Sequence, residues 1–156
     1  MLNAKRISWA AVIAWMAIIF FLSHQPGSQS SELSSVITEN IIKAAEKISP
    51  ALGASVETFH TLVRKSAHFI AYLLLGALSL NALRKSGITG CRSFALALGI
   101  SILYAVSDEI HQLFIPGRSG EARDVLIDST GAATGLALIW LASKLLISRK
   151  NVHSQI

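Results

Sequence analysis

The most informative part of this sequence is FALALGISILYAVSDEIHQLFIPG, residues 94–117. Its uninterrupted apolar part, residues 94–106, is about 13 residues long, whereas a helix that crosses a membrane needs about 20. Residues 107–114 contain no helix breaker before Pro116-Gly117, so they can supply the missing length. We therefore predict a membrane helix over about residues 93–114, whose last turns carry Asp108, Glu109 and His111.

Three further apolar stretches predict spans over about residues 7–23, 66–83 and 124–147. Hydrophobic residues make up 52% of the 156 residues and the mean hydropathy is +0.53, which is more apolar than a soluble domain needs. The first stretch begins like a signal peptide but lacks a small-residue cleavage site, so we expect it to remain as an anchor. The sequence thus predicts an all-α integral membrane bundle of about four transmembrane helices, forming one domain over residues 1–156.

The charged residues are unevenly distributed among the segments that connect these spans. With the amino end inside, the inner segments hold eight Lys and Arg and no Asp or Glu, and the outer segments hold six Lys and Arg and nine Asp and Glu. Cytoplasmic segments are typically enriched in Lys and Arg, so we expect both termini in the cytoplasm. The net charge of +5 therefore reflects membrane orientation, and no nucleic-acid partner is expected because the basic residues do not form a patch.

The long outer segment contains an amphipathic pattern over about residues 32–48. Glu39 and Lys43 have the i,i+4 order that stabilises a helix, and Ser49-Pro50 is a plausible stop. The pattern is too polar to span a bilayer. We expect an extracytoplasmic amphipathic helix that lies in the headgroup layer or covers the outer mouth of the bundle.

Polar side chains gather at the outer ends of three predicted spans. Because ionisable groups at that depth are costly unless they face the bundle interior or a wet cavity, they indicate a functional site. The set comprises Lys65, His68, Tyr72, Asp108, Glu109, His111, Gln112, Arg118, Asp124 and Asp128.

The chain resembles the VanZ-like family of bacterial membrane proteins in three segments, FLSHQPGSQS (21–30), RKSAHFIAYLLLGAL (64–78) and YAVSDEIHQLFIPGRSGEARDVLIDSTGAATG (104–135). The resemblance implies a protein of the bacterial cytoplasmic membrane with a cell-envelope role, linked to resistance against the glycopeptide teicoplanin. It does not supply a reaction. His24 departs from the pattern, because a second small polar residue is expected after Ser23. The motif positions that carry over are Lys65, His68, Tyr72, Asp108, Glu109, His111, Gln112, Pro116, Gly117, Arg118 and Asp124.

The spacing within the third span suggests acid–base chemistry. Asp108, His111 and Gln112 share one helical face, whereas Glu109 points about 100° away. A carboxylate beside an imidazole is the minimum for general acid–base catalysis. The residues expected to be catalytic are Asp108, Glu109, His111 and His68.

A second group of residues fits substrate binding, namely Lys65, Tyr72, Gln112, Arg118 and Asp124. Lys65 or Arg118 can neutralise an anionic substrate such as a phosphate. The loop at residues 116–120 leads into a helix amino end, where backbone N–H groups also favour anions. This combination suggests a lipid-linked or peptidoglycan-related anion. The expected partners are membrane lipids and a lipid-linked cell-wall precursor.

Other interpretations of the same residues stay open. The basic residues Lys65 and Arg118 can instead pair with the carboxylates in a buried ion network without catalysis. Asp108, His111 and His68 are acceptable metal ligands, so a metal site is a further alternative. It is less favoured because their spacing does not match a recognised metal motif, and no metal or cofactor is expected. A transporter is disfavoured because the inner halves of the spans lack ionisable residues.

Gly131 and Gly135 form a G-x-x-x-G pair that predicts close helix packing, either within the bundle or in a homo-oligomer. Two hypotheses for function remain. In one, the protein is an envelope hydrolase or transferase; in the other, it is a non-catalytic protein that binds or shields an envelope lipid or a partner protein.

Overall fold

The computed structural model of the chain describes residues 2–26 and 56–153, and side chains over residues 2–26 and 61–145. It contains four helices in these ranges: α1 (Leu2–Ser23), α3 (Val56–Lys85), α4 (Gly90–Gln112) and α5 (Ala122–His153). No strand occurs in the described ranges. The predicted all-helical fold is therefore confirmed, whereas the amphipathic helix expected over residues 32–48 lies outside the described residues.

Each helix contains a segment long and apolar enough to cross a membrane: Leu2–Ser23, Thr61–Lys85, Gly90–Gln112 and Ala122–Leu145. Large apolar side chains such as Leu103 and Leu126 are exposed on the outside of the bundle, as expected for surfaces that face lipid. Helix α4 continues through the polar residues to Gln112, which confirms that they complete the short apolar stretch.

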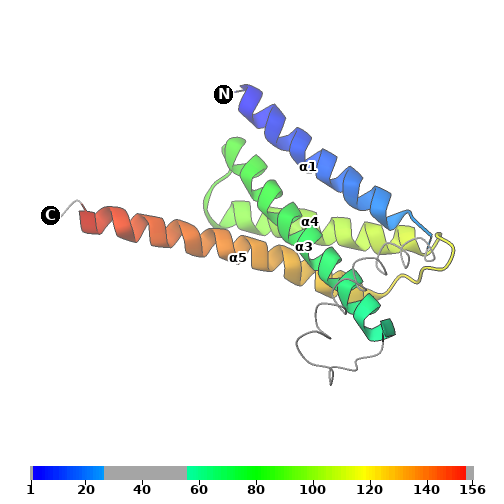
Figure 1. Cartoon of the computed structure of the whole chain (residues 1–156). Helices are drawn as coiled ribbons and strands as arrows, with labels where there is room; N and C mark the ends of the chain where they lie inside the picture. Colours follow the sequence, from blue (N-terminus) through cyan, green and yellow to red (C-terminus); the bar gives the residue numbers. More distant parts are fainter. Residues whose placement is uncertain (1, 27–55, 154–156) are drawn as a thin grey trace, which may run out of the picture.

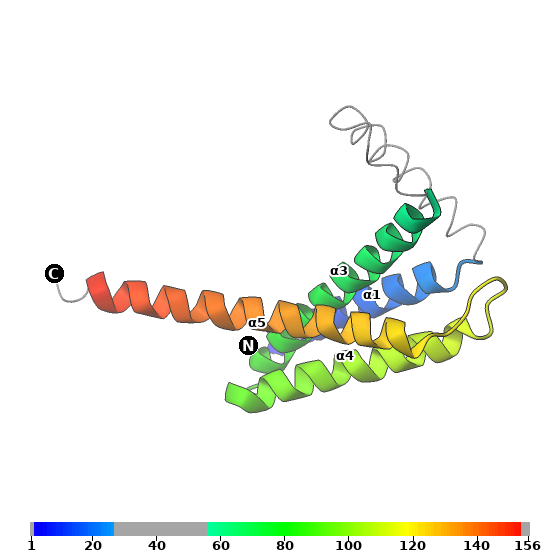
Figure 2. The same ribbon diagram turned by 90° about the horizontal axis from the view of Figure 1, so that it is seen from below.

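Consecutive helices run in opposite directions, so that the carboxyl ends of α1 and α4 and the amino ends of α3 and α5 meet at one end of the bundle (Figure 1). We call this the polar end. The amino end of α1 and the carboxyl end of α5 lie away from it, and the last part of α5 extends past the other helices (Figure 2). The predicted site residues are therefore brought toward the same end, except that Tyr72 lies near the middle of α3.

Helices α3 and α5 form the most extensive contact in the bundle. A Cβ atom on Gly131 would collide with the carbonyl oxygen of Phe69, and one on Gly135 would collide with that of Leu73. Only glycine at these two positions allows the two backbones to approach so closely. Of the two predicted uses of this glycine pair, the structure shows packing within one chain, and a homo-oligomer stays a prediction.

Helix α1 is attached to the other helices by aromatic side chains that donate hydrogen bonds. The Trp15 indole donates to the Ala71 carbonyl of α3 at 2.9 Å, and the Tyr104 hydroxyl of α4 donates to the Met16 carbonyl at 2.6 Å. Around them, Val12, Ile19, Leu75 and Ala105 belong to one buried apolar cluster. These contacts fix the end of α1 beside the polar residues of α4.

Candidate functional site

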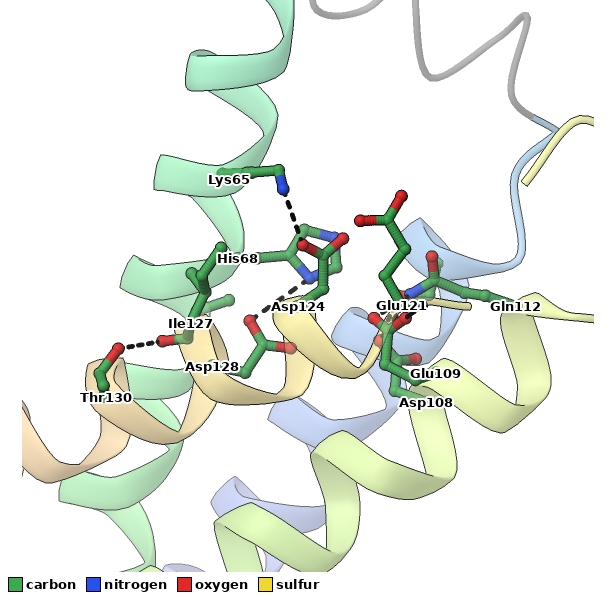
Figure 3. Close-up of polar contacts among 12 residues, drawn as sticks. Lys65, His68, Asp108, Glu109, Gln112, Glu121, Asp124, Ile127, Asp128 and Thr130 are labelled. Atoms are coloured by element: carbon green, nitrogen blue, oxygen red, sulfur yellow. Dashed lines mark hydrogen bonds and ion pairs between the residues drawn. The ribbon is translucent and has the colours of Figure 1, made fainter. Parts of the chain in front are cut away.

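The polar end contains a buried cluster of charged and polar side chains from three helices. Asp108, Glu109 and Gln112 in the last turns of α4 are each at most 5% exposed, and Asp128 of α5 is fully buried. Lys65 and His68 of α3 point toward the first turns of α5 (Figure 3). The convergence expected from the sequence is therefore present.

An ion pair and a histidine–aspartate contact join α3 to α5, one helical turn apart. Lys65 Nζ lies 3.0 Å from Asp124 Oδ1, and both side chains are about one-fifth exposed. His68 Nδ1 lies 3.7 Å from Asp128 Oδ1, and the exposed fraction falls from 22% for the imidazole to 0% for the carboxylate. The site thus changes from a partly wet rim at Lys65 to a dry interior at Asp128.

Asp108 is held in place through only one of its two carboxylate oxygens. The Ser23 hydroxyl donates to Oδ2 at 2.8 Å, and the Gln112 amide donates to the same oxygen at 3.2 Å. The other oxygen, Oδ1, is buried and has no hydrogen-bond partner among the residues that the structure describes. Asp108 therefore has a fixed orientation and one oxygen available for a ligand.

Glu109 connects the end of α4 to the start of α5. Its Oε2 accepts the backbone N–H of Glu121 at 2.8 Å, just before α5 begins, and its Oε1 accepts from the Gln112 amide at 3.2 Å. A carboxylate at a helix amino end complements the helix dipole. Although Glu109 and Asp108 point in different directions along α4, the Gln112 amide bridges them. This geometry gives Glu109 a structural role.

The loop between α4 and α5 contains a tight turn and an arginine that fastens it to α1. The Arg118 N–H donates to the Ile115 carbonyl at 3.1 Å, and Gly117 between them has a φ of 74°, which favours glycine. The guanidinium donates to the carbonyls of Gln25 at 3.0 Å and Leu22 at 3.2 Å, and to Gln112 Oε1 at 3.2 Å.

Burial and the nearby positive charge of Arg64 both lower the pKa of the Arg118 guanidinium. Arginine nevertheless stays protonated in proteins, so two cations lie near each other at this end. The expected anion-holding residue Arg118 already uses three of its donors within the chain. Its clearest role here is to position the loop.

His111 does not form the expected pair with Asp108. Its Nε2 lies 3.1 Å from His24 Nδ1, and its ring packs against Phe20. Residues three apart on a helix are offset by about 60°, and here Asp108 is buried against Ser23 while His111 contacts the next residue, His24. The imidazole nearest a buried carboxylate is instead His68.

A comparison with protein families matches residues 8–143 to the family model described as VanZ/LLP1. The chain belongs to the VanZ/LLP1 family. This confirms the resemblance seen in the sequence, and the matched range includes every site residue described above. Comparisons with curated proteins and with solved structures found no match.

Some residues of this VanZ/LLP1 chain have a larger part in the site than the sequence suggested. Ser23 orients Asp108 by donating a hydrogen bond to it. In the sequence, the feature that could have indicated this role is the position of Ser23 where the first span meets a polar segment. Asp128 was counted among the polar residues at the outer ends but in neither the catalytic nor the substrate-binding group, yet it faces His68 directly. The Tyr72 hydroxyl is buried and has no hydrogen-bond partner in the described part of the chain.

Among the described residues, no group of three or more His, Cys, Asp or Glu is arranged to hold a metal ion.

Proposed function

We propose that this VanZ/LLP1 membrane protein is an enzyme of the bacterial cell envelope. It hydrolyses or transfers part of a phosphate-bearing, lipid-linked or peptidoglycan-related substrate, and this activity contributes to teicoplanin resistance. The site faces the outside of the cytoplasmic membrane and both termini face the cytoplasm, as the distribution of Lys and Arg favours. The observation that carries the proposal is the contact between His68 and the fully buried Asp128.

This contact supports acid–base catalysis by His68. With a proton on Nδ1 directed at Asp128, the imidazole presents the lone pair of Nε2 as a base. The separation of 3.7 Å is longer than a hydrogen bond, and such contacts commonly shorten when substrate binds. Because His68 is partly exposed and Asp128 is not, the imidazole would act on the substrate and the carboxylate would orient it.

The cations at the polar end support an anionic substrate. The Lys65 ammonium has three donors and stays 23% exposed while it contacts Asp124. The charge of Arg64 acts on Arg118 across the same region. A phosphate bound near Lys65, Arg64 and Arg118 would relieve the repulsion between the two arginine side chains. It would also accept hydrogen bonds from the Lys65 ammonium.

The second candidate function is a non-catalytic protein that binds or shields an envelope lipid or a partner protein. It is favoured by the hydrogen bonds of Arg118, Gln112 and Glu109, which are directed to groups of the same chain. In that case the ionic contacts would mainly hold the short polar ends of the helices together.

The proposal is tested in a susceptible bacterial strain whose teicoplanin tolerance depends on this chain. His68→Gln and Asp128→Asn should each lower the minimum inhibitory concentration to that of a strain without the protein. Glu121→Gln is the matched control, because it removes an exposed carboxylate at the same end of the bundle. Immunoblots of membranes must show equal amounts of each variant. Full tolerance in both site variants would contradict the acid–base assignment and favour the non-catalytic function.

The substrate class is tested by mass spectrometry of lipids that purify with the protein. A phosphate-bearing lipid should be enriched in the natural chain and depleted in Lys65→Gln. Lys144→Gln provides the control, because Lys144 is exposed on α5 away from the polar end. Equal lipid recovery in the two variants would argue against a phosphate contact at Lys65.

A further inference from the structure

Several buried oxygen atoms of the site have no hydrogen-bond partner within the described residues. They include Tyr72 Oη of α3, Asp108 Oδ1 of α4 and both carboxylate oxygens of Asp128 of α5. All three residues are at most 3% exposed. An unsatisfied buried polar atom typically costs about 1–3 kcal/mol, so several together in one place call for a ligand.

These atoms belong to one cluster. The Tyr72 ring of α3 packs against the Tyr104 ring of α4 with centroids 6.3 Å apart, and Asp108 lies one turn beyond Tyr104 toward the polar end. Asp128 of α5 contacts His68, which lies one turn from Tyr72 on α3. Figure 3 shows Asp128 on the side of α5 that faces His68, with Asp108 on the neighbouring helix. The site therefore places two carboxylates in a buried region, and the charged or titratable partner recorded for Asp128 within the described residues is His68.

The surrounding contacts orient the free oxygens. Ser23 and Gln112 both donate to Oδ2 of Asp108, which leaves Oδ1 free. His68 Nδ1 lies 3.7 Å from Oδ1 of Asp128, so Oδ2 is the oxygen of that carboxylate that lacks even this contact. Metal-binding carboxylates are usually held in this way, with one oxygen fixed by neighbouring groups and the other directed at the ion.

We propose that Tyr72 Oη, Asp108 Oδ1 and Asp128 Oδ2 bind a hard divalent cation, Mg²⁺ or Ca²⁺. Both ions prefer oxygen ligands, and Mg²⁺ in particular is commonly bound by one or two carboxylates together with waters and substrate phosphate. The cation offsets the charge of two buried carboxylates, which would otherwise be costly at this depth. The proposal rests on the proposed function only for the phosphate that would complete the coordination.

The proposed site lies close to the polar end of the bundle. Asp128 lies about 9 Å along the helix from Ala122, where α5 begins, at 1.5 Å per residue. Lys65, Asp124 and His68 line the way and are each about one-fifth exposed. An ion entering from the aqueous side therefore passes through a polar rim before it meets the two carboxylates.

The test measures binding of Tb³⁺, a hard cation whose luminescence is sensitised by nearby aromatic rings, to the full chain in lipid nanodiscs. We expect saturable emission that Mg²⁺ or Ca²⁺ displaces, and separate titrations of the two ions identify the preferred one. Asp108→Asn and Asp128→Asn should each weaken Tb³⁺ binding by about tenfold or more. Tyr72→Phe should weaken it by a smaller factor and reduce the sensitised emission, because it removes one neutral ligand.

Two variants keep the outcome interpretable. Glu121→Gln should leave Tb³⁺ binding unchanged, since its carboxylate is exposed and outside the cluster. His68→Gln keeps both carboxylates, so it should weaken Tb³⁺ binding less than either aspartate variant does while abolishing teicoplanin tolerance, and the cation site and the acid–base function can therefore fail separately. The proposal is overturned if neither aspartate variant changes Tb³⁺ binding, or if millimolar Mg²⁺ and Ca²⁺ do not compete.

Discussion

Replacing Arg118 with alanine should destabilise the polar end substantially. The guanidinium makes three hydrogen bonds, two to backbone carbonyls near the end of α1 and one to the side chain of Gln112. A hydrogen bond from a charged donor typically contributes about 1.5–3 kcal/mol, and less where it is exposed to solvent. Because the contact with Leu22 is exposed, we expect the free energy of unfolding to fall by about 2–4 kcal/mol.

Arg118→Lys separates a positioning role from a purely electrostatic one. Lysine keeps the positive charge, but its single ammonium cannot reach three acceptors that match the fork of a guanidinium. If Arg118 mainly fastens the loop to α1, the lysine variant should be almost as unstable as the alanine variant. If it mainly attracts an anionic substrate, the lysine variant should stay stable and keep most of the phosphate-lipid recovery.

The measurement is the free energy of unfolding in micelles, followed by tryptophan fluorescence during titration with a denaturing detergent. Arg123→Ala is the control, because Arg123 is an exposed arginine in the first turn of α5. A loss of less than about 0.5 kcal/mol in both Arg118 variants would refute the reasoning, because surface substitutions commonly stay within that range.

Three further predictions address packing and orientation. Gly135→Ala should lower the free energy of unfolding in micelles by about 1–3 kcal/mol, because its Cβ would meet a carbonyl of α3. Gly99→Ala, with open space around it, should be neutral or stabilising, and equal effects of the two changes would contradict the packing. Tyr104→Phe should lower the free energy of unfolding by about 1 kcal/mol and Tyr72→Phe by less, because of the two hydroxyls only that of Tyr104 has a hydrogen-bond partner among the described residues. A larger loss in Tyr72→Phe would contradict this assignment of hydrogen bonds. Cys91, the single cysteine, should react with a membrane-impermeant maleimide only after cells are opened; labelling of intact cells would reverse the orientation.

The spans were predictable because hydropathy and length are properties of the chain read in one dimension. The apolar part of the third span was too short alone, and this deficit correctly indicated that Asp108, Glu109 and Gln112 belong to the helix. The alternating direction of successive spans then brought the polar residues of α3, α4 and α5 to one end. The spans and the end at which the polar residues gather can therefore be predicted without knowing how each helix is rotated about its axis.

The partners within the site were not predictable, because they depend on the rotation of each helix about its axis. Spacing alone placed Asp108 and His111 on one face, but the rotation of α4 directs Asp108 to Ser23 and His111 to His24. The partner of the Gly131 and Gly135 face was also undetermined, since a G-x-x-x-G pattern describes only one of the two surfaces in contact.

The glycine packing and the polar site are parts of one interface between α3 and α5. Both helices start at the polar end, and their contacts advance together, from Lys65 with Asp124 and His68 with Asp128 to Phe69 with Gly131 and Leu73 with Gly135. Gly131 follows Asp128 by less than one turn, so the close backbone approach that it permits also sets how near the carboxylate comes to the imidazole. The apolar half of this interface thereby supplies the packing that keeps a buried carboxylate facing His68, and the unpartnered oxygens at its polar half are where a ligand would bind.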